Sequence, residues 1–299
     1  MDSLDFAAPP VVDTVYADYV LDALWDWRRA GLKTALLTLT EIDGISPRPL
    51  GSQMAVAEDG RAVGAISGGC AERSLVLDAQ AAMARGLNHS ERYGKGSRFK
   101  DLIFPCGSGI GVYFDVGLDD AVLADLRAAH AQRRSCDYAC GAYVKRYDPQ
   151  TRLVIAGSGH IVPVLAHLAG LAEIEVVVLS PDAATRMAAA PFARSEGFHG
   201  ADVAGHLDSA AAFVCLFHDH DREPELLDAV LRSPAFYIGA LGSHATHRRR
   251  CESLASRGWD VAAVARIHGP VGLAIGAKTP PEIALAIVAE IVQARRAGS

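Results

Sequence analysis

The pattern of apolar and polar positions changes character close to residue 150. Before that point, short apolar runs mix with amphipathic stretches and do not alternate strictly with them. The pattern predicts strands at 34–42, 54–57, 63–66, 101–104 and 111–116, and helices at 15–30, 67–85 and 120–134. This mixture predicts an α+β N-terminal domain over residues 1–147.

Beyond the polar break Tyr147-Asp148-Pro149-Gln150, apolar strands and helical stretches alternate. The apolar runs at 153–156, 175–179, 211–217 and 236–241 are nearly continuous, as in strands that are buried on both faces. A helix is expected at 161–171, and the last helix opens at Thr279-Pro280-Pro281-Glu282, which has capping-box spacing. We therefore expect an α/β chain whose second domain, residues 151–299, is Rossmann-type with a parallel sheet.

Composition places the chain among soluble globular proteins. Of its 299 residues, 50% are hydrophobic and 21% are charged, and the formal net charge is -6. The acidic balance argues against a nucleic-acid partner, because such proteins usually carry a basic face. No run of about 18 apolar residues occurs, so no membrane partner is expected. The N-terminus lacks the basic start and apolar run of a secretion signal, so we expect a cytoplasmic protein.

The turn Gly157-Ser158-Gly159-His160 lies between the first strand and the first helix of the parallel half. Glycines there allow the backbone to approach a phosphate closely, and the free N–H groups at a helix start favour an anion. A dinucleotide fingerprint would have glycine or alanine at Pro163 and an acid at Ser180, where this chain has Asp182 two residues further on. We predict a phosphate-bearing ligand at this turn, with NAD(P) as one alternative.

A second group of candidates lies in the N-terminal half. Ser67-Gly68-Gly69, at a predicted helix start, offers another backbone nest for an anion. The helix N-terminus favours the thiolate of Cys70, which could then contact a metal or help to pass a sulfur; the alternative is a small apolar residue buried in the turn. Cys106, in a glycine-rich segment, has the same two interpretations. Arg48 is either a cation of this site or an exposed loop arginine.

The remaining candidates follow strands of the parallel half, at the edge where ligands of open α/β sheets gather. His218-Asp219-His220 is a polar wall of the ligand cleft, a metal cluster or a solvated loop. Ser243 and Arg248 are predicted to contact an anion, whereas Arg249 and Arg250 are expected on a solvated helix face. The six cysteines include no metal-type CxxC pair, and Cys136-to-Cys140 has the spacing of one helical turn.

Six segments taken together resemble a known family. In chain order they are Ser67-Gly68-Gly69-Cys70-Ala71-Glu72, Pro105-Cys106-Gly107, Gly157-Ser158-Gly159-His160, His218-Asp219-His220-Asp221, Tyr237-Ile238-Gly239-Ala240-Leu241-Gly242-Ser243, and Gly269-Pro270-Val271-Gly272-Leu273 followed by Thr279-Pro280-Pro281-Glu282-Ile283-Ala284. The set resembles the XdhC/CoxI family, the accessory proteins of xanthine dehydrogenase and related molybdenum hydroxylases. The chain departs from the family's pattern at Ser180, Asp182 and Ala274, which leaves the ligand of the glycine turn open.

The resemblance implies an XdhC-type N-terminal domain followed by a Rossmann domain. It implies a chaperone without turnover that binds molybdenum cofactor (molybdopterin), protects it during sulfuration and delivers it to a molybdenum hydroxylase apo-enzyme. A homodimer and a cysteine desulfurase partner are further expectations. Molybdopterin is an anionic, phosphorylated pterin dithiolene, so the two backbone nests would supply N–H donors and Cys70 a metal contact. The alternatives are an NAD(P)-dependent oxidoreductase and a docking or regulatory protein with the same fold.

Overall fold

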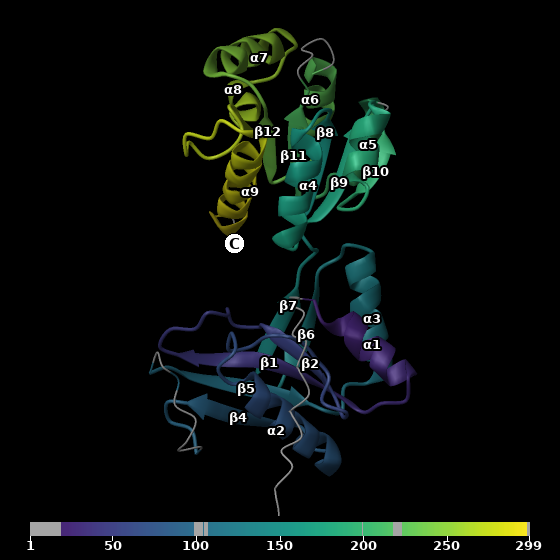
Figure 1. Ribbon diagram of the computed structural model, residues 1–299, viewed down its shortest axis with the longest axis vertical. Coiled ribbons are helices and arrows are strands. Elements are labelled where there is room, and N and C mark those ends of the chain that lie inside the picture. Colours follow the sequence, from purple (N-terminus) through teal and green to yellow (C-terminus); the bar gives the residue numbers. More distant parts are fainter. Residues whose placement is uncertain (1–18, 99–103, 105–106, 199, 218–222, 298–299) are drawn as a thin grey trace, which may run out of the picture. The chain divides into compact units, whose positions relative to one another are not determined.

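The computed structural model describes residues 19–98, 104, 107–198, 200–217 and 223–297. The chain divides into two compact units between Pro149 and Gln150 (Figure 1). Among the described helices, none is both long enough and apolar enough to cross a membrane.

The first unit is built on an antiparallel sheet with the strand order β3-β2-β1-β5-β4. Its strands are β1 (Thr34–Asp43), β2 (Gln53–Ala57), β3 (Ala62–Gly64), β4 (His89–Gly94) and β5 (Gly109–Asp115). Side chains of β1 alternate between the two faces, so Ala35 and Leu37 enter one apolar core and Leu36 enters the other. Both faces of this sheet are therefore covered.

Different elements cover the two faces. Helix α2 (Glu72–Arg85) packs Leu75, Ala79 and Met83 against the first face. The second face is covered by α1 (Leu21–Arg29), α3 (Asp120–Ala131) and a separate hairpin of β6 (Cys136–Cys140) and β7 (Tyr143–Tyr147). The first unit is thus α+β, as the sequence predicted.

The sequence pattern did not predict three strands of this unit. Strand β4 is a polar edge strand whose one buried residue is Tyr93, so it lacks an apolar run. Strands β6 and β7 are short and alternate buried or partly buried with exposed positions around a turn at Gly141, where φ is +63°. Cys136 and Cys140 lie on strand β6, so the prediction of one helical turn was wrong. The predicted strand 101–104 falls mostly outside the described residues, and Phe104 lies in no strand.

The second unit holds a six-stranded parallel sheet in the order β10-β9-β8-β11-β12-β13. Its strands are β8 (Arg152–Gly157), β9 (Glu175–Ser180), β10 (Arg194–Gly197), β11 (Ala211–Leu216), β12 (Tyr237–Ala240) and β13 (Ile267–His268). In chain order this is third, second, first, fourth, fifth, sixth, the strand order of a Rossmann fold. The predicted α/β fold class is confirmed.

Helices cover both faces of the parallel sheet (Figure 1). Helices α4 (Ile161–Leu171), α5 (Ala183–Ala189) and α9 (Pro280–Ala297) share one apolar core with the sheet. Helices α6 (Glu223–Leu231), α7 (His244–Ser256) and α8 (Val261–Val264) and the 3₁₀ helix Gly200–His206 lie on the other face. The strand order reverses between β8 and β11, and ligands of open α/β sheets bind beyond the carboxyl ends of the strands at such a point.

Candidate functional site

The glycine turn joins β8 to α4 where the strand order reverses. Gly157 ends β8, and a Cβ there would lie 2.7 Å from the Cβ and 2.9 Å from the carbonyl carbon of Leu216 on β11. Gly159 has a φ of +96°, which side-chain-bearing residues rarely adopt. Both glycines are therefore needed for this backbone path, and His160 is exposed where α4 begins.

Three backbone N–H groups at this turn donate to no acceptor in the part of the chain that the structure describes. They belong to Ser158, His160 and Ile161. The N–H of Gly159 donates to Thr185 Oγ1 at 3.0 Å, and that of Val162 donates to the Gly159 carbonyl. Unpaired N–H groups at a helix start carry partial positive charge, so this turn can hold a phosphate.

The polar residues at the end of β9 are already engaged. Ser180 is completely buried, and its Oγ accepts the N–H of Asp182 at 3.2 Å. The Asp182 carboxylate caps α5 by accepting the N–H of Thr185 at 2.9 Å and its hydroxyl at 2.5 Å. These bonds, first that from the Thr185 hydroxyl, lower the pKa of Asp182. Asp182 is thus used as a helix cap and supports the Thr185 side chain that holds the glycine turn.

Gly157→Ala is expected to lower the free energy of unfolding by about 1–3 kcal/mol, because the new methyl group must displace the backbone of β11. Gly170→Ala is the matched control, since a Cβ at this position of α4 meets nothing within 4 Å. Alanine there should stabilise the helix by roughly 0.5–1 kcal/mol. Urea unfolding measures both variants, and equal stability would contradict the close approach of β8 and β11.

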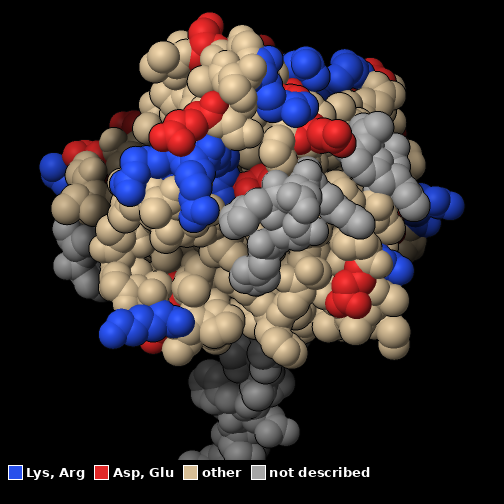
Figure 2. Space-filling view, turned by 90° about the horizontal axis from the view of Figure 1, so that it is seen from above, with Lys and Arg blue, Asp and Glu red and all other residues tan. Residues whose placement is uncertain are grey.

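Ser243 and Arg248 lie at the start of α7, directly beyond β12. Ser243 Oγ accepts the N–H of Thr246 at 3.1 Å and so caps the helix, while Arg248 is exposed one turn further on. Figure 2 looks onto the end of the second unit that carries α7 and shows basic and acidic side chains interspersed. On this face, basic side chains thus lie next to acidic ones.

Arg250 is buried, so the prediction of a solvated face was wrong for this residue. Its Nε donates to Glu223 Oε1 at 2.5 Å, and its Nη2 donates to the Leu241 carbonyl at 2.7 Å. The two side chains are only 4% and 6% exposed. The pair joins the start of α6 to α7 and supports the loop after β12, whereas the neighbouring Arg249 is exposed, as expected.

Arg250 also sets the protonation of His247, a residue that was not predicted from the sequence. Its Nη1 lies 3.3 Å from His247 Nδ1, and because a guanidinium only donates, Nδ1 accepts and Nε2 carries the proton. Nε2 lies 3.5 Å from the Sγ of Cys251. Burial first, and then the charge of Arg250, lower the pKa of His247 and keep the ring neutral. The spacing of four residues between histidine and cysteine on a predicted helix was the available signal.

Four of the predicted site residues, His218, Asp219, His220 and Cys106, lie outside the described residues. Within the described ranges, no three or more histidine, cysteine, aspartate or glutamate side chains are grouped to hold a metal ion. Cys70, the predicted metal contact, is thus not one of several metal-ligating side chains grouped together among the described residues.

In the first unit, the carboxylate of Glu72 fills the Ser67-Gly68-Gly69 nest. Its Oε1 accepts the N–H groups of Ser67 at 2.7 Å and Gly68 at 3.0 Å. Its Oε2 accepts the N–H of Gly69 at 2.7 Å and the Ser67 hydroxyl at 2.5 Å. Burial raises the pKa of Glu72, but the bonds from Ser67 and the backbone outweigh it and the pKa is lowered. The expectation that these N–H groups face a ligand is corrected, because the chain's own carboxylate pairs with them.

Cys70 is exposed in this loop, so the alternative of a buried apolar residue is wrong. Gly68 and Gly69 have φ values of +76° and +113°, which allow the chain to wrap around Glu72. Arg48 is buried, and its Nε donates to the Ala65 carbonyl at 3.3 Å. Arg48 is therefore not an exposed loop arginine, and it lies against the segment that leads to Cys70.

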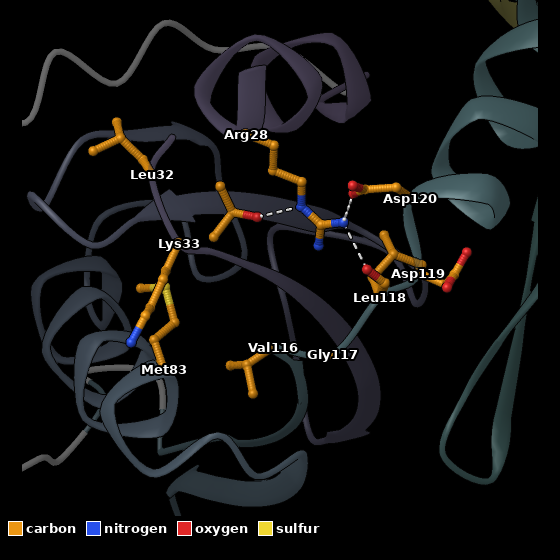
Figure 3. Close-up of a pocket in the computed structure, with 10 residues that line it drawn as sticks. Arg28, Leu32, Lys33, Met83, Val116, Gly117, Leu118, Asp119 and Asp120 are labelled. Carbon is orange, nitrogen blue, oxygen red and sulfur yellow. Dashed lines mark hydrogen bonds and ion pairs between the residues drawn. The ribbon is translucent and has the colours of Figure 1, made fainter. Parts of the chain in front are cut away.

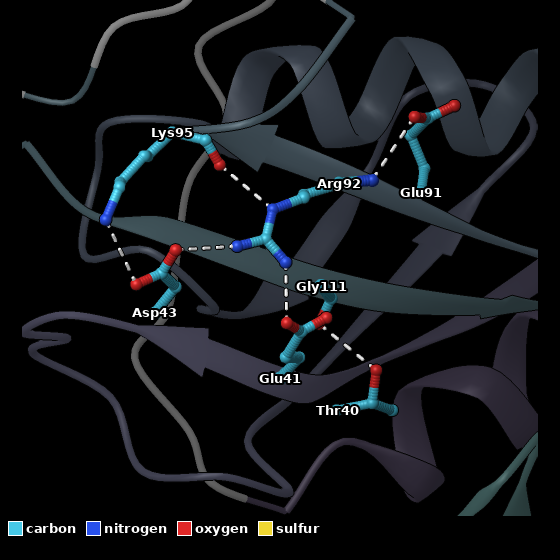
Figure 4. A network of polar contacts seen from close by, with 7 residues as sticks. All are labelled: Thr40, Glu41, Asp43, Glu91, Arg92, Lys95 and Gly111. Carbon is cyan, nitrogen blue, oxygen red and sulfur yellow. Dashed lines mark hydrogen bonds and ion pairs between the residues drawn. The ribbon is translucent and has the colours of Figure 1, made fainter.

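Arg92 ties the end of β1 to the edge strand β4 (Figure 4). Its Nη1 lies 2.6 Å from Glu41 and its Nη2 2.9 Å from Asp43. Its Nε donates to the Lys95 carbonyl at 2.9 Å. These groups are partly exposed, so each ion pair contributes about 1 kcal/mol or less. The network fixes the point at which β1 leads into the loop that carries Arg48.

Known proteins match both units of the chain. A model of the XdhC Rossmann domain matches residues 153–291, and a model of the XdhC and CoxI family matches residues 27–94. The molybdenum cofactor insertion chaperone PaoD of Escherichia coli (strain K12) is 31% identical over 281 residues, which cover 89% of this chain and 85% of that protein. A probable xanthine dehydrogenase subunit of Bacillus subtilis (strain 168) is 25% identical over a match that covers 93% of this chain and 97% of that protein. A crystal structure of a xanthine dehydrogenase from Bacillus halodurans shares the fold with a TM-score of 0.77 at 23% identity, covering 93% of this chain and 96% of that one.

Proposed function

Because the chain belongs to the XdhC and CoxI family, we propose that it is a chaperone that binds the molybdenum cofactor and helps to insert it into a xanthine dehydrogenase or a related molybdenum hydroxylase. The observation that carries this proposal is the 31% identity to the insertion chaperone PaoD over 89% of the chain. Protection of the cofactor during sulfuration, a cysteine desulfurase partner, a homodimeric state and a cytoplasmic location belong to the same proposal.

The donor groups of each unit suit such a cargo. Molybdopterin brings a phosphate and a dithiolene-bound metal to the protein. We assign the phosphate to the unpaired N–H groups of Ser158, His160 and Ile161 at the start of α4. We assign the metal to the exposed Cys70, because a thiolate is a soft ligand for such a metal.

The remaining predicted residues have supporting roles in this proposal. Gly157 and Gly159 shape the phosphate turn, and Ser243 and Arg248 are further anion contacts beyond β12. Ser67, Gly68 and Gly69 hold the Cys70 loop on Glu72 instead of binding the cargo themselves. An NAD(P)-dependent oxidoreductase is not favoured, because Ser180 is buried and Asp182 caps α5 rather than meeting a ribose.

Mass spectrometry of the ligand released from the purified protein tests the proposal. Protein from a host that makes molybdopterin is expected to release a molybdopterin derivative, and protein from a host that lacks this synthesis is expected to release none. Cys70→Ala should lower the cofactor retained per mole of protein by about tenfold. Its melting temperature should stay within about 2 °C, because the exposed thiol packs against no core.

Cys136→Ala is the control, since it removes a partly exposed thiol of the same unit on strand β6. It should retain cofactor at the wild-type level. Equal retention in Cys70→Ala and the wild type would remove the assignment of Cys70. Absence of any pterin from the wild-type protein would remove the proposed function.

A further inference from the structure

A cavity of about 430 Å³ lies in the first unit, away from the sites described above (Figure 3). It is lined by residues of α1, the start of β1, the end of α2 and the start of α3, among them Arg28, Lys33, Met83, Val116 and Asp120. Met83 stands eleven positions after Glu72, which is about 16 Å along α2. The cavity is therefore separate from the Cys70 loop at the other end of that helix.

Arg28 is fixed in the wall of this cavity. Its Nε donates to Thr34 Oγ1 at 2.8 Å, and its Nη1 donates to the Leu118 carbonyl and to Asp120 Oδ1, both at 2.6 Å. The side chain is only 15% exposed. No described residue accepts a hydrogen bond from Nη2, and Figure 3 shows this nitrogen pointing into the space between Lys33 and Val116. The guanidinium is thus held rigidly with one donor edge left open to the cavity.

The other lining groups define what could meet that edge. The Lys33 ammonium is exposed and has no ion-pair or hydrogen-bond partner among the described residues. Asp120 is paired with Arg28, and the Asp119 carboxylate caps α3 through the N–H of Ala121 and points away from Arg28 (Figure 3). Asp120 thus offsets part of the charge of Arg28 and Asp119 serves as a helix cap, while Arg28 Nη2 and the Lys33 ammonium have no acceptor among the described residues.

Apolar side chains complete the lining. Leu32, Met83 and Val116 belong to the lining, and Met83 lies next to Lys33 (Figure 3). The volume falls in the range of pockets for small organic ligands, roughly 300–1,000 Å³. An occupant that satisfies both parts of the lining needs an anionic head and an apolar or aromatic body.

We propose that this cavity binds a small phosphomonoester whose phosphate is held by Arg28 Nη2 and Lys33 Nζ and whose apolar body rests on Met83 and Val116. A guanidinium of fixed orientation suits the planar, directional recognition of phosphate oxygens. The ammonium adds a mobile second charge for a dianionic head. The proposal does not depend on the binding of the molybdenum cofactor.

Isothermal titration of the full chain with phenyl phosphate, at fixed ionic strength, tests this site. Saturable binding is expected, with inorganic phosphate binding about fivefold more weakly because it lacks the apolar body. Lys33→Met should weaken phenyl phosphate binding about fivefold. Arg28→Lys should weaken it about tenfold, because lysine keeps the charge but lacks the paired N–H donors of the guanidinium. Arg29→Met removes the same charge from an exposed position of α1 and should change the affinity by less than about twofold.

Lys33→Met decides the outcome even where Arg28→Lys reduces the amount of folded protein, because the Lys33 side chain has no hydrogen-bond or ion-pair partner within the described residues. The proposal is overturned by a lack of saturation up to about 10 mM phenyl phosphate. It is equally overturned by unchanged affinity in Lys33→Met, which would place the binding at another site such as the glycine turn. Lys33→Met should retain molybdopterin at the wild-type level, so failure here and failure of the proposed function are distinguishable.

Discussion

Arg250→Met is expected to lower the free energy of unfolding by about 3–5 kcal/mol. The substitution leaves the Glu223 carboxylate, only 6% exposed, without its cation at 2.5 Å. It also removes the hydrogen bond to the Leu241 carbonyl, which lies at the end of β12. Urea unfolding at neutral pH measures the loss. Under the proposed function, cofactor retention should fall in parallel, because the loop that carries Ser243 loses its support.

Two further variants show whether the unpaired charge is the cause. The double variant Glu223→Leu with Arg250→Met removes both charges and should be more stable than Arg250→Met alone, since no buried carboxylate remains unpaired. Arg249→Met, at the exposed neighbouring position, should change stability by no more than about 0.5 kcal/mol. If Arg250→Met is no less stable than Arg249→Met, the ion pair does not support the junction of α6 and α7.

Glu72→Gln is expected to lower the free energy of unfolding by about 2–4 kcal/mol at neutral pH. The amide group of glutamine turns an N–H toward donors that now point at a carboxylate oxygen, among them the N–H of Gly69 at 2.7 Å. The Cys70 loop should loosen as a result. Under the proposed function, this variant should also retain less cofactor than the wild type although Glu72 itself touches no cargo.

The effect of Glu72 should depend on pH in a defined direction. The folded state lowers the pKa of this carboxyl below its ordinary value of 4.5, so the ionised form favours folding. Its contribution is complete above about pH 4.5 and is lost as the pH falls through the lower, folded-state pKa. The difference in melting temperature between the wild type and Glu72→Gln should therefore be largest at neutral pH and shrink below pH 4.5.

Glu252→Gln is the control for this series, because Glu252 is an exposed glutamate on α7. Its melting temperature should follow that of the wild type at each pH. A difference between wild type and Glu72→Gln that stays constant from pH 7 to about pH 3 would show that the carboxylate does not hold the loop by its charge.

The parallel sheet could be predicted because each of its central strands is a continuous apolar run. The glycine turn could be predicted as well, because its backbone path requires glycines. Gly157 lies too close to β11 for a side chain, and Gly159 has a positive φ. Strands β6 and β7 were missed because they are short and because two of their exposed positions, Ala139 and Val144, are apolar, which obscures the alternation. Local patterns thus identify elements whose burial is complete and miss those that are half-buried.

The sites were less predictable than the fold, because their partners are tertiary. Glu223 and Arg250 stand 27 positions apart, and nothing in the periodicity of either helix pairs them. The nest at Ser67-Gly68-Gly69 could be recognised from its glycines, whereas its occupant, Glu72, fell inside the predicted helix 67–85, which in the structure begins only at Glu72. Arg28 is another case, since its contacts to Thr34 and Leu118 depend on how α1 packs on the sheet.

The loop that presents Cys70 is held in shape by a side chain of the protein itself. Ordering an interface on binding costs roughly 0.5–1.5 kcal/mol for each immobilised side chain, and a loop that is already ordered avoids much of this loss of conformational entropy. The Glu72 carboxylate occupies the nest without any ligand, so the shape of the loop does not depend on one. Under the proposed function, neither uptake nor release of the cofactor then requires this loop to fold or unfold.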